Sequence, residues 1–264
     1  MVRLAKAHAY GNDFLLVEDI DIGTGDRAAI ARAMCDRHRG VGADGLIVYG
    51  LTPRGARMRL SNADGSPAEI SGNGVRCLAA WLAQTALESG RETRDLAIDT
   101  DAGPKLLTLV ERVGGRFTFR AALGPPEGIA QRDLVAAGEP VRAVTLRVGN
   151  PQCVVLGEAS EAILHRLGLA LATHAAFPEG TNVEFATVEA PDRVRIVIWE
   201  RGVGPTLASG TGACAAAVAA AAFGGASRDV QVSSPGGTQR VEWRDDGLYL
   251  TGWAEVVLTG EWGK

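Results

Sequence analysis

The chain of 264 residues repeats its own motifs in one order, and this repeat constrains the fold more than any other feature. Gly11-Asn12 opens an apolar run in the first half, and Gly149-Asn150 opens another in the second half. The segments Ser71–Gly74 (SGNG) and Ser209–Gly212 (SGTG) are separated by the same interval as those two pairs, and each precedes an alanine-bearing apolar stretch. A chain with 34 glycines produces single Gly-x-Gly matches by chance, but ordered matches at one offset indicate a duplication. We therefore predict two similar domains of roughly 120 to 130 residues each.

Two further pairs of segments extend the repeat. Asp44 precedes one apolar run and Asn182 precedes another, again at the same offset. Towards the end of each half, Arg94–Leu96 and Arg228–Val230 match at a slightly smaller offset. The smaller offset predicts that the intervening helix is about four residues shorter in the second half.

Each half combines short strand-like runs with few helical segments, which is typical of an α+β fold. The predicted strands are 13–17, 46–49, 97–99, 106–111 and 116–120 in the first half, and 153–156, 183–186, 193–199, 230–233 and 248–251 in the second. The predicted helices are 26–37, 74–89 and 211–223. We expect one long central helix among several antiparallel strands in each half, with a boundary near Pro125–Gly128.

Composition and charge exclude several classes of protein. With 46% hydrophobic and 22% charged residues, the chain is typical of a packed globular protein. Its net charge of −4 and the lack of a basic stripe argue against a nucleic-acid partner. The longest apolar run, Ala213–Ala226, is too short to span a membrane, and Met1–Phe14 has no secretory core. We expect a cytoplasmic protein with reduced thiols.

Residue counts also bear on cofactors. Only Lys6, Lys105 and Lys264 could form a Schiff base with pyridoxal phosphate, and none of them lies in a motif. The four histidines are scattered singly, and the four cysteines form no metal-binding pattern with them. We therefore expect chemistry without a cofactor and without a metal.

The strongest chemical signal is the pair of Ser-Gly-x-Gly turns. Serine is a good N-cap, and the first N–H groups of a helix bind anions such as carboxylates. Polar residues precede each turn: Asn62 the first, and Glu200-Arg201 the second. Asn12, Asn150 and Asn182 each stand where a strand is expected to begin. Two such turns at matching places in a duplicated chain favour one ligand site formed by both domains.

The chain resembles diaminopimelate epimerase and related cofactor-independent amino-acid racemases. The residues that carry the resemblance are His8–Phe14, Arg37–Gly45, Asn62–Ser66, Gly72–Cys77, Gly149–Cys153, Glu179–Val183, Glu200–Gly204 and Gly210–Cys214. They span nearly the whole chain in the order of the family. The resemblance implies two pseudo-symmetric domains, each a β-barrel-like sheet around a central helix. It also implies that the C-terminal strand returns to the first domain, which gives domains of 1–120 plus about 253–264, and of 121–252.

The resemblance further implies an isomerase of lysine and cell-wall precursor synthesis, which inverts an amino-acid α-carbon with two groups acting as base and acid. Ser71 and Ser209 occupy these two positions. Backbone N–H groups of Gly72, Asn73, Gly210 and Thr211 are expected to bind the α-carboxylate. The amino and distal groups of the substrate are assigned to Asn62, Asn150, Asn182, Glu200 and Arg201, with Asn12 nearby. The expected partner is a small-molecule amino acid; the oligomeric state is open, with a homodimer as one option.

The chain departs from the family at the reactive positions. Both acid/base groups of the family are cysteines, whereas this chain has Ser71 and Ser209. Gln152 replaces a histidine of the family, and Pro205 stands where a glutamate is usual. Three explanations are open: a natural branch with altered chemistry, an engineered double Cys→Ser form, or a binding protein that has lost catalysis. The changes at Gln152 and Pro205 favour the first of these, because a simple Cys→Ser design has no reason to alter them.

Overall fold

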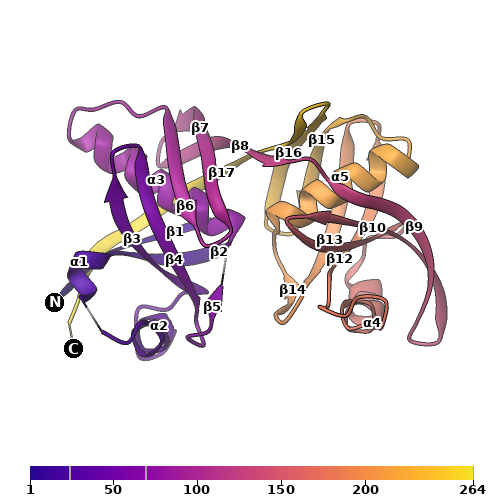
Figure 1. Cartoon of the computed structure of the whole chain (residues 1–264), viewed down its shortest axis with the longest axis horizontal. Coiled ribbons are helices and arrows are strands. Elements are labelled where there is room, and N and C mark those ends of the chain that lie inside the picture. The colour runs from indigo at the N-terminus through magenta and orange to yellow at the C-terminus, as the bar shows by residue number, and fades with distance from the viewer. Residues whose placement is uncertain (24, 69, 264) are drawn as a thin grey trace. The chain divides into compact units, whose positions relative to one another are not determined.

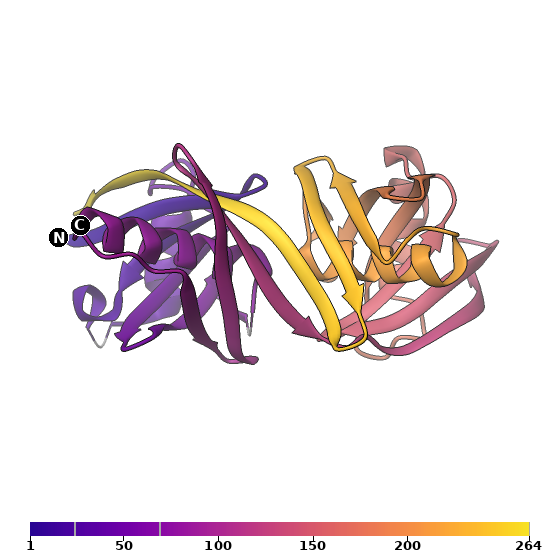
Figure 2. The same cartoon turned by 90° about the horizontal axis from the view of Figure 1, so that it is seen from above.

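The computed structural model describes residues 1–23, 25–68 and 70–263. The chain forms two compact units, Met1–Ala121 with Gly252–Lys264, and Ala122–Thr251 (Figure 1). The last strand contributes its first residues to the second unit and its remaining residues to the first (Figure 2). Each unit is described by itself below.

The first unit combines a sheet with one long and two short helices. Its elements are β1 (Val2–Ala9), β2 (Asn12–Glu18), α1 (Asp19–Ile22), α2 (Arg27–Cys35), β3 (Gly45–Thr52), β4 (Gly55–Asn62), β5 (Pro67–Ala68), α3 (Gly72–Glu88), β6 (Asp95–Thr100), β7 (Gly103–Val113) and β8 (Arg116–Gly124), together with most of β17 (Gly247–Trp262). The strands pair in the order β17, β1, β2, β3, β4, β6, β7 and β8, and β8 also pairs with β17. The sheet therefore closes on itself as a barrel.

The second unit repeats this plan. Its elements are β9 (Glu127–Ala136), β10 (Glu139–Val148), β11 (Asn150–Leu156), α4 (Glu161–Ala172), β12 (Asn182–Ala190), β13 (Arg193–Glu200), β14 (Gly204–Thr206), α5 (Gly210–Phe223), β15 (Asp229–Ser234) and β16 (Gly237–Arg244), with the start of β17. The strands pair in the order β9, β10, β11, β12, β13, β15, β16 and β17.

The ladder registers of the two units match at the offsets found in the sequence. In the first unit β4 and β6 are parallel and pair Gly55 with Ala97, and in the second β13 and β15 are parallel and pair Arg193 with Gln231. The larger offset relates Gly55 to Arg193, before the central helix, and the smaller one relates Ala97 to Gln231, after it. The predicted α+β fold with two similar, barrel-like halves is therefore confirmed.

One alignment of the repeat is wrong by one residue. The sequence matched Asp44 with Asn182, but Asn182 lies opposite Gln152 as Gly45 lies opposite Phe14. Because Phe14 and Gln152 are themselves equivalent, Asn182 takes the place of Gly45. The whole connection from β11 to β12, which contains α4, is one residue shorter than the connection from β2 to β3, which contains α2.

Each barrel is built around its long helix. α5 buries apolar residues on all sides, and its core includes residues of β10, β11, β12, β13, β15, β16 and β17. α3 packs against β1, β2, β4, β6 and β7. A second helix, α2 in the first unit and α4 in the second, covers the outer face of the sheet. The parallel pairs β2–β3 and β11–β12 are thus buried on both faces, which explains their continuous apolar runs.

Several elements differ from the sequence-based expectation. The sheets are mixed rather than antiparallel, because β2–β3, β4–β6, β11–β12 and β13–β15 are parallel pairs. The central helices begin directly after their serines, at Gly72 and Gly210, rather than at residues 74 and 211. Helix α2 ends at Cys35, before the expected end at residue 37. The prediction missed α4 altogether, although Ser160 caps it and its leucines follow a helical period.

Candidate functional site

In the first unit, Ser71 and the first turn of α3 form the predicted helix start. Ser71 is extended in backbone conformation, and its Oγ accepts a hydrogen bond from the Gly74 N–H at 3.1 Å. This is N-cap geometry, in which the remaining N–H groups of the first turn have no partner inside the helix. Gly72 and Asn73 are the first two residues of this turn. The start of α3 can therefore hold an anion, provided that the rest of the site is shaped for one.

Asn73 is fixed by an arginine inside the first barrel. Arg76 is 2% exposed, and its Nη2 donates to Asn73 Oδ1 at 2.5 Å. The Arg76 guanidinium also lies over the Tyr10 ring, 5.8 Å from its centroid. The Tyr10 hydroxyl accepts a hydrogen bond from the Trp253 N–H at 3.1 Å. The Asn73 side chain is thus engaged within the unit.

Asn12, the first residue of β2, lies on the face of the sheet that meets the start of α3. A two-residue turn, with φ of 57° at Tyr10 and 88° at Gly11, connects β1 to β2 and places Asn12 first in that strand. Phe14, two residues further on, faces the first turn of α3, so the alternation of side chains puts Asn12 on this face too. Asn12 Oδ1 is buried and has no hydrogen-bond partner among the residues that the structure describes. A buried amide oxygen without a partner is a signal for a ligand donor.

Asn62 ends β4 in a compact turn. Its N–H donates to Ser66 O at 2.8 Å, and its Nδ2 donates to Ser66 Oγ at 3.0 Å. Asp64 Oδ1 accepts from the N–H and Oγ of Ser66, and these hydrogen bonds hold the pKa of Asp64 below its usual range. Asn62 lies directly opposite Gly45 in the ladder. Asn62 is therefore the last residue of β4 and is held by the turn that follows it.

A cluster of charged side chains, Lys6, Asp13, Arg37 and Asp44, holds the start of β2 against the residue that precedes β3. The sequence analysis did not assign this cluster a role. Asp13 accepts from Arg37 at 2.7 and 3.1 Å and lies 3.0 Å from Lys6 Nζ. The Asp13 and Asp44 carboxylates each accept from the other residue's backbone N–H, at 3.0 and 3.1 Å. Burial opposes ionisation of Asp13, but Arg37 and Lys6 outweigh it and lower the Asp13 pKa to about 2.

In the second unit, Ser209 caps α5 as Ser71 caps α3. Ser209 Oγ accepts from the Gly212 N–H at 3.2 Å, and the residue is only 4% exposed. Gln239 Nε2 donates to Ser209 O at 3.4 Å, which ties the cap to β16. Gly210 and Thr211 are the first two residues of α5. The two helix starts thus share one backbone design.

The strand ends that face this turn carry the predicted polar residues. Asn150 and Asn182 begin β11 and β12, and Glu200 ends β13. Gln152 Nε2 donates to Asn150 Oδ1 at 2.5 Å, and Asn182 Oδ1 accepts from the Arg201 N–H at 3.0 Å. Gln152 is opposite Asn182 in the ladder, so side chains from neighbouring strands gather on one face. The structure thus brings these residues of the second unit together.

Glu184 belongs to this face, and the sequence analysis missed it. It stands in β12 two residues after Asn182, is completely buried, and lies against the first turn of α5. Neither of its carboxyl oxygens has a hydrogen-bond partner within the described residues. Burial and, to a smaller degree, the charge of Glu200 raise the pKa of Glu184 well above its ordinary value. The available signal was an acidic residue inside the otherwise apolar run 183–186.

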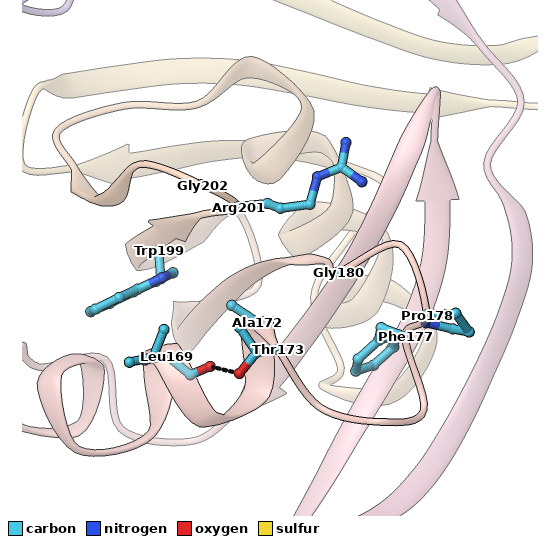
Figure 3. A pocket seen from close by; sticks show the side chains of 9 residues that line it. All are labelled: Leu169, Ala172, Thr173, Phe177, Pro178, Gly180, Trp199, Arg201 and Gly202. Atoms are coloured by element: carbon cyan, nitrogen blue, oxygen red, sulfur yellow. Dashed lines mark hydrogen bonds between the residues drawn. The ribbon is translucent and has the colours of Figure 1, made fainter.

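Arg201 is exposed and lies at the edge of a small pocket in the second unit. Its Nη1 donates to Glu179 O at 2.6 Å. The pocket is lined by Leu169, Ala172, Thr173, Phe177, Pro178, Gly180, Trp199, Arg201 and Gly202 (Figure 3). Figure 3 shows the side chains of Trp199 and Arg201 extending in opposite directions from the end of β13. The Arg201 guanidinium is therefore available to a ligand outside the apolar part of this pocket.

The cysteines are not available for acid/base chemistry. Cys35, Cys77, Cys153 and Cys214 are all buried and form no disulfide. Burial raises the pKa of Cys35 and of Cys153 to about 12 and raises the pKa of Cys77 as well. Cys77 and Cys214 lie inside α3 and α5 and are buried, so they cannot replace thiols at the helix starts. Across residues 1–23, 25–68 and 70–263, no cluster of His, Cys, Asp and Glu could hold a metal ion.

Comparison with known proteins identifies the family. The family model described as diaminopimelate epimerase matches residues 4–126 and 144–257. The chain belongs to the diaminopimelate epimerase family. The diaminopimelate epimerase of Desulforudis audaxviator is 40% identical over 284 residues, which cover 99% of each chain. That of Synechococcus elongatus is 38% identical and covers 98% of this chain and 97% of its own.

Solved structures show the same fold at lower identity. A predicted epimerase from Pseudomonas aeruginosa superposes with a TM-score of 0.75 at 17% identity, over 99% of each chain. A hydroxyproline epimerase from Agrobacterium vitis, solved with bound trans-4-hydroxy-L-proline, gives a TM-score of 0.70 at 16% identity, over 98% of this chain and 91% of that chain. The chain is thus a diaminopimelate epimerase-like isomerase. No helix in the described part of the chain is long and apolar enough to cross a membrane.

Proposed function

We propose that the chain acts on diaminopimelate, in lysine and cell-wall precursor synthesis, and exchanges the proton on one α-carbon without a cofactor. Family membership over the whole chain supports this proposal. The observation that carries it is the repeated helix start. In each unit a serine caps a buried central helix, and an asparagine at the start of a strand, Asn12 in the first and Asn182 in the second, shares the face that meets the first turn of that helix.

The helix starts are assigned to the substrate α-carboxylate. The backbone N–H groups of Gly72 and Asn73 in one unit, and of Gly210 and Thr211 in the other, lie in the first turn of a central helix and carry partial positive charge. Such groups would also stabilise negative charge that develops on the carboxylate when the α-proton leaves. The amino and distal groups are assigned to Asn62, Asn150, Asn182, Glu200 and Arg201, and Asn12 Oδ1 offers one more acceptor.

Ser71 and Ser209 are assigned to opposite faces of the α-carbon. One serine would remove the α-proton while the other returns a proton to the far side. A hydroxyl is much less acidic than a thiol and needs a neighbouring base to remove a proton from carbon. We therefore expect slow epimerisation by the chain as it stands.

Binding of the amino acid without inversion is the second candidate function. It is favoured by the buried cysteines, because no thiol near the helix starts in the described part of the chain can replace the serines. Both candidates require the same ligand and differ only in chemistry.

Calorimetry with LL-diaminopimelate, followed by mass spectrometry of the ligand after incubation with the full chain in heavy water, tests the proposal. We expect saturable binding and slow deuterium incorporation at the α-carbon. Binding with no incorporation, even after long incubation at high protein concentration, would favour the second candidate. Failure to bind diaminopimelate would overturn both assignments.

A further inference from the structure

Glu184 is a buried carboxyl group that the proposed mechanism leaves unused. Its side chain has no measurable exposure, and neither oxygen has a hydrogen-bond partner among residues 1–23, 25–68 and 70–263. Leaving such a group without a partner costs free energy, and native proteins tolerate it mainly where the group has a function.

Glu184 lies against the turn that holds Ser209. A β-carbon placed on Gly212 would be 2.6 Å from Glu184 Oε1 and 3.2 Å from Ser209 Cβ. The carboxyl group and the serine side chain therefore flank the same point in the first turn of α5. The Ser209 hydroxyl accepts a hydrogen bond from the Gly212 N–H, which leaves its own hydrogen free to be donated.

Among the described residues, the positive charge at this end is Arg201, which directly follows β13 and whose exposed guanidinium donates to the Glu179 carbonyl. β11 carries only the neutral Cys153, and α5 has no charged residue. On β13, Glu200 lies near Glu184 and disfavours its ionisation. Arg193 and Arg195 stand at the other end of β13, and Arg195 is paired with Glu189. Glu184 is thus the ionisable group placed to exchange a proton with Ser209 from behind.

We propose that Glu184 is the proton partner of Ser209, an assignment that rests on the proposed function. When the substrate Cα–H bond breaks, Ser209 Oγ takes the proton and the electron pair stays on the carbon. For this step the Ser209 O–H turns towards Glu184, to which it is not hydrogen-bonded in this structure; the O–H bond then breaks, and its proton passes to the Glu184 carboxylate. In the reverse step Glu184 returns its proton to Ser209 Oγ, which gives the other proton to the carbon. Glu184 acts through Ser209 and does not touch the substrate.

The first unit, as far as its residues are described, lacks this device. Ile47 is opposite Leu16 as Glu184 is opposite Val154, and Leu16 and Val154 are equivalent in the repeat. A β-carbon on Gly74 would meet Ile47 Cδ1 at 3.0 Å. Ser71 therefore has an apolar neighbour where Ser209 has a carboxyl group. The proposal assigns the faster proton exchange to the Ser209 side.

The test measures α-deuterium incorporation in heavy water, as a function of pH, from LL- and meso-diaminopimelate. Four full-length proteins are compared: the unmodified chain, Glu184→Gln, Ser209→Cys and the double variant Glu184→Gln/Ser209→Cys. We expect Glu184→Gln to slow exchange by roughly tenfold or more in the serine form, and by less than about threefold when Ser209 is replaced by cysteine. A thiolate needs no partner base, so the cysteine form is insensitive to the loss. The rise of the rate with pH should also disappear in Glu184→Gln.

Glu189→Gln is the matched control, because it removes an exposed carboxylate from the same strand. Thermal melting and diaminopimelate binding verify that each variant folds. If Glu184→Gln does not fold, Glu184→Asp replaces it, with a loss of exchange again expected in the serine form alone.

Equal losses in the serine and cysteine forms, or no loss in either, would overturn the assignment of Glu184. Absence of exchange by every protein that retains Ser209 would overturn it as well. In each of these cases, exchange by a fifth protein, Ser71→Cys/Ser209→Cys, would still support the proposed function. Failure of that form to exchange or to bind diaminopimelate would instead overturn the proposed function itself.

Discussion

Ile47 in the first unit and Glu184 in the second occupy the same place in the repeated fold, each against the last glycine of a Ser-Gly-x-Gly turn. A β-carbon on Gly74 would lie 3.0 Å from Ile47 Cδ1, and one on Gly212 would lie 2.6 Å from Glu184 Oε1. A side chain at either glycine would therefore displace the end of this strand side chain. The backbone of the two helix starts is alike, but among the described residues only the second has an ionisable group behind it.

Replacing Glu184 by Gln is expected to stabilise the protein above neutral pH. Burial raises the pKa of Glu184 in the folded state above its value in the unfolded chain. The folded state therefore binds more protons, and the free energy of unfolding falls as pH rises from the ordinary pKa of Glu towards the raised one. Glutamine cannot ionise, so this decline should be absent. Urea unfolding between pH 4 and pH 9 measures the difference, with Glu189→Gln as the control.

Replacing Asp13 by Asn is expected to destabilise the first unit at neutral pH. The Asp13 pKa is lowered from 3.8 to about 2, because Arg37 and Lys6 outweigh its burial; after allowance for solvent screening this corresponds to a net stabilisation of about 1–2 kcal/mol. A lowered pKa gives stability that is present above pH 3.8 and is lost as the pH falls through about 2. The difference between Asp13→Asn and the unmodified protein should therefore shrink in acid.

Urea unfolding at pH 7 and at pH 2.5 compares the two proteins. Asp133→Asn is a suitable control, because Asp133 forms an exposed ion pair with Arg142. A loss of stability that stays constant with pH would contradict the electrostatic origin and indicate a packing effect.

The repeat in the sequence was sufficient to predict two similar α+β halves, because equal offsets force equal ladders. It could not predict that β2–β3 and β11–β12 are parallel. Their apolar runs carry no alternation, since helices cover both faces of the sheet. The predicted starts of α3 and α5 were one or two residues too late. Glycine is unfavourable inside a helix, but here Gly72 and Gly210 belong to the first turn.

The candidate site shows where local patterns are insufficient. Asn12, Asn150 and Asn182 were placed correctly at strand starts, because turn residues mark these positions. Glu184 and Arg76 were missed, because their importance depends on what packs around them inside a barrel. An acidic residue in an apolar strand, or an arginine in an apolar helix, becomes informative only when burial is known. The roles of the site residues, and the approach of Ser71 and Ser209 to one carbon atom, stay predictions.

Removing the guanidinium of Arg201 is expected to weaken binding of diaminopimelate. The Arg201 side chain is exposed, and its Nη1 donates a hydrogen bond to the Glu179 carbonyl. A charged hydrogen bond to a ligand carboxylate contributes roughly 1.5–3 kcal/mol, so Arg201→Ala should reduce affinity at least tenfold. Calorimetry measures the loss, and Arg193→Ala removes a charge from the other end of β13 as a control. Equal affinity in Arg201→Ala and the unmodified protein would exclude Arg201 from the binding residues.

Restoring thiols at both helix starts is expected to restore fast epimerisation. A helix N-terminus lowers the pKa of a cysteine, and the thiolate is the species that removes a proton. Ser71 and Ser209 cap their helices by accepting hydrogen bonds from the N–H groups of Gly74 and Gly212, so cysteine would stand at the same positive ends. Because positioned acid/base groups contribute roughly 10²–10⁴-fold each, Ser71→Cys/Ser209→Cys should raise the rate at least about a hundredfold.

The single variants separate exchange from inversion. Ser71→Cys or Ser209→Cys alone supplies one efficient base, so each should increase α-deuterium incorporation from one stereoisomer of diaminopimelate more than it increases epimerisation. Inversion needs an efficient proton donor on the far side, which the remaining serine does not provide. Chiral chromatography together with mass spectrometry measures both rates in one sample. Brisk epimerisation by the unmodified chain would show that the serines suffice. If the double-cysteine form binds diaminopimelate without a gain in rate, Gln152 and Pro205 become the residues that mark a different substrate or a binding role.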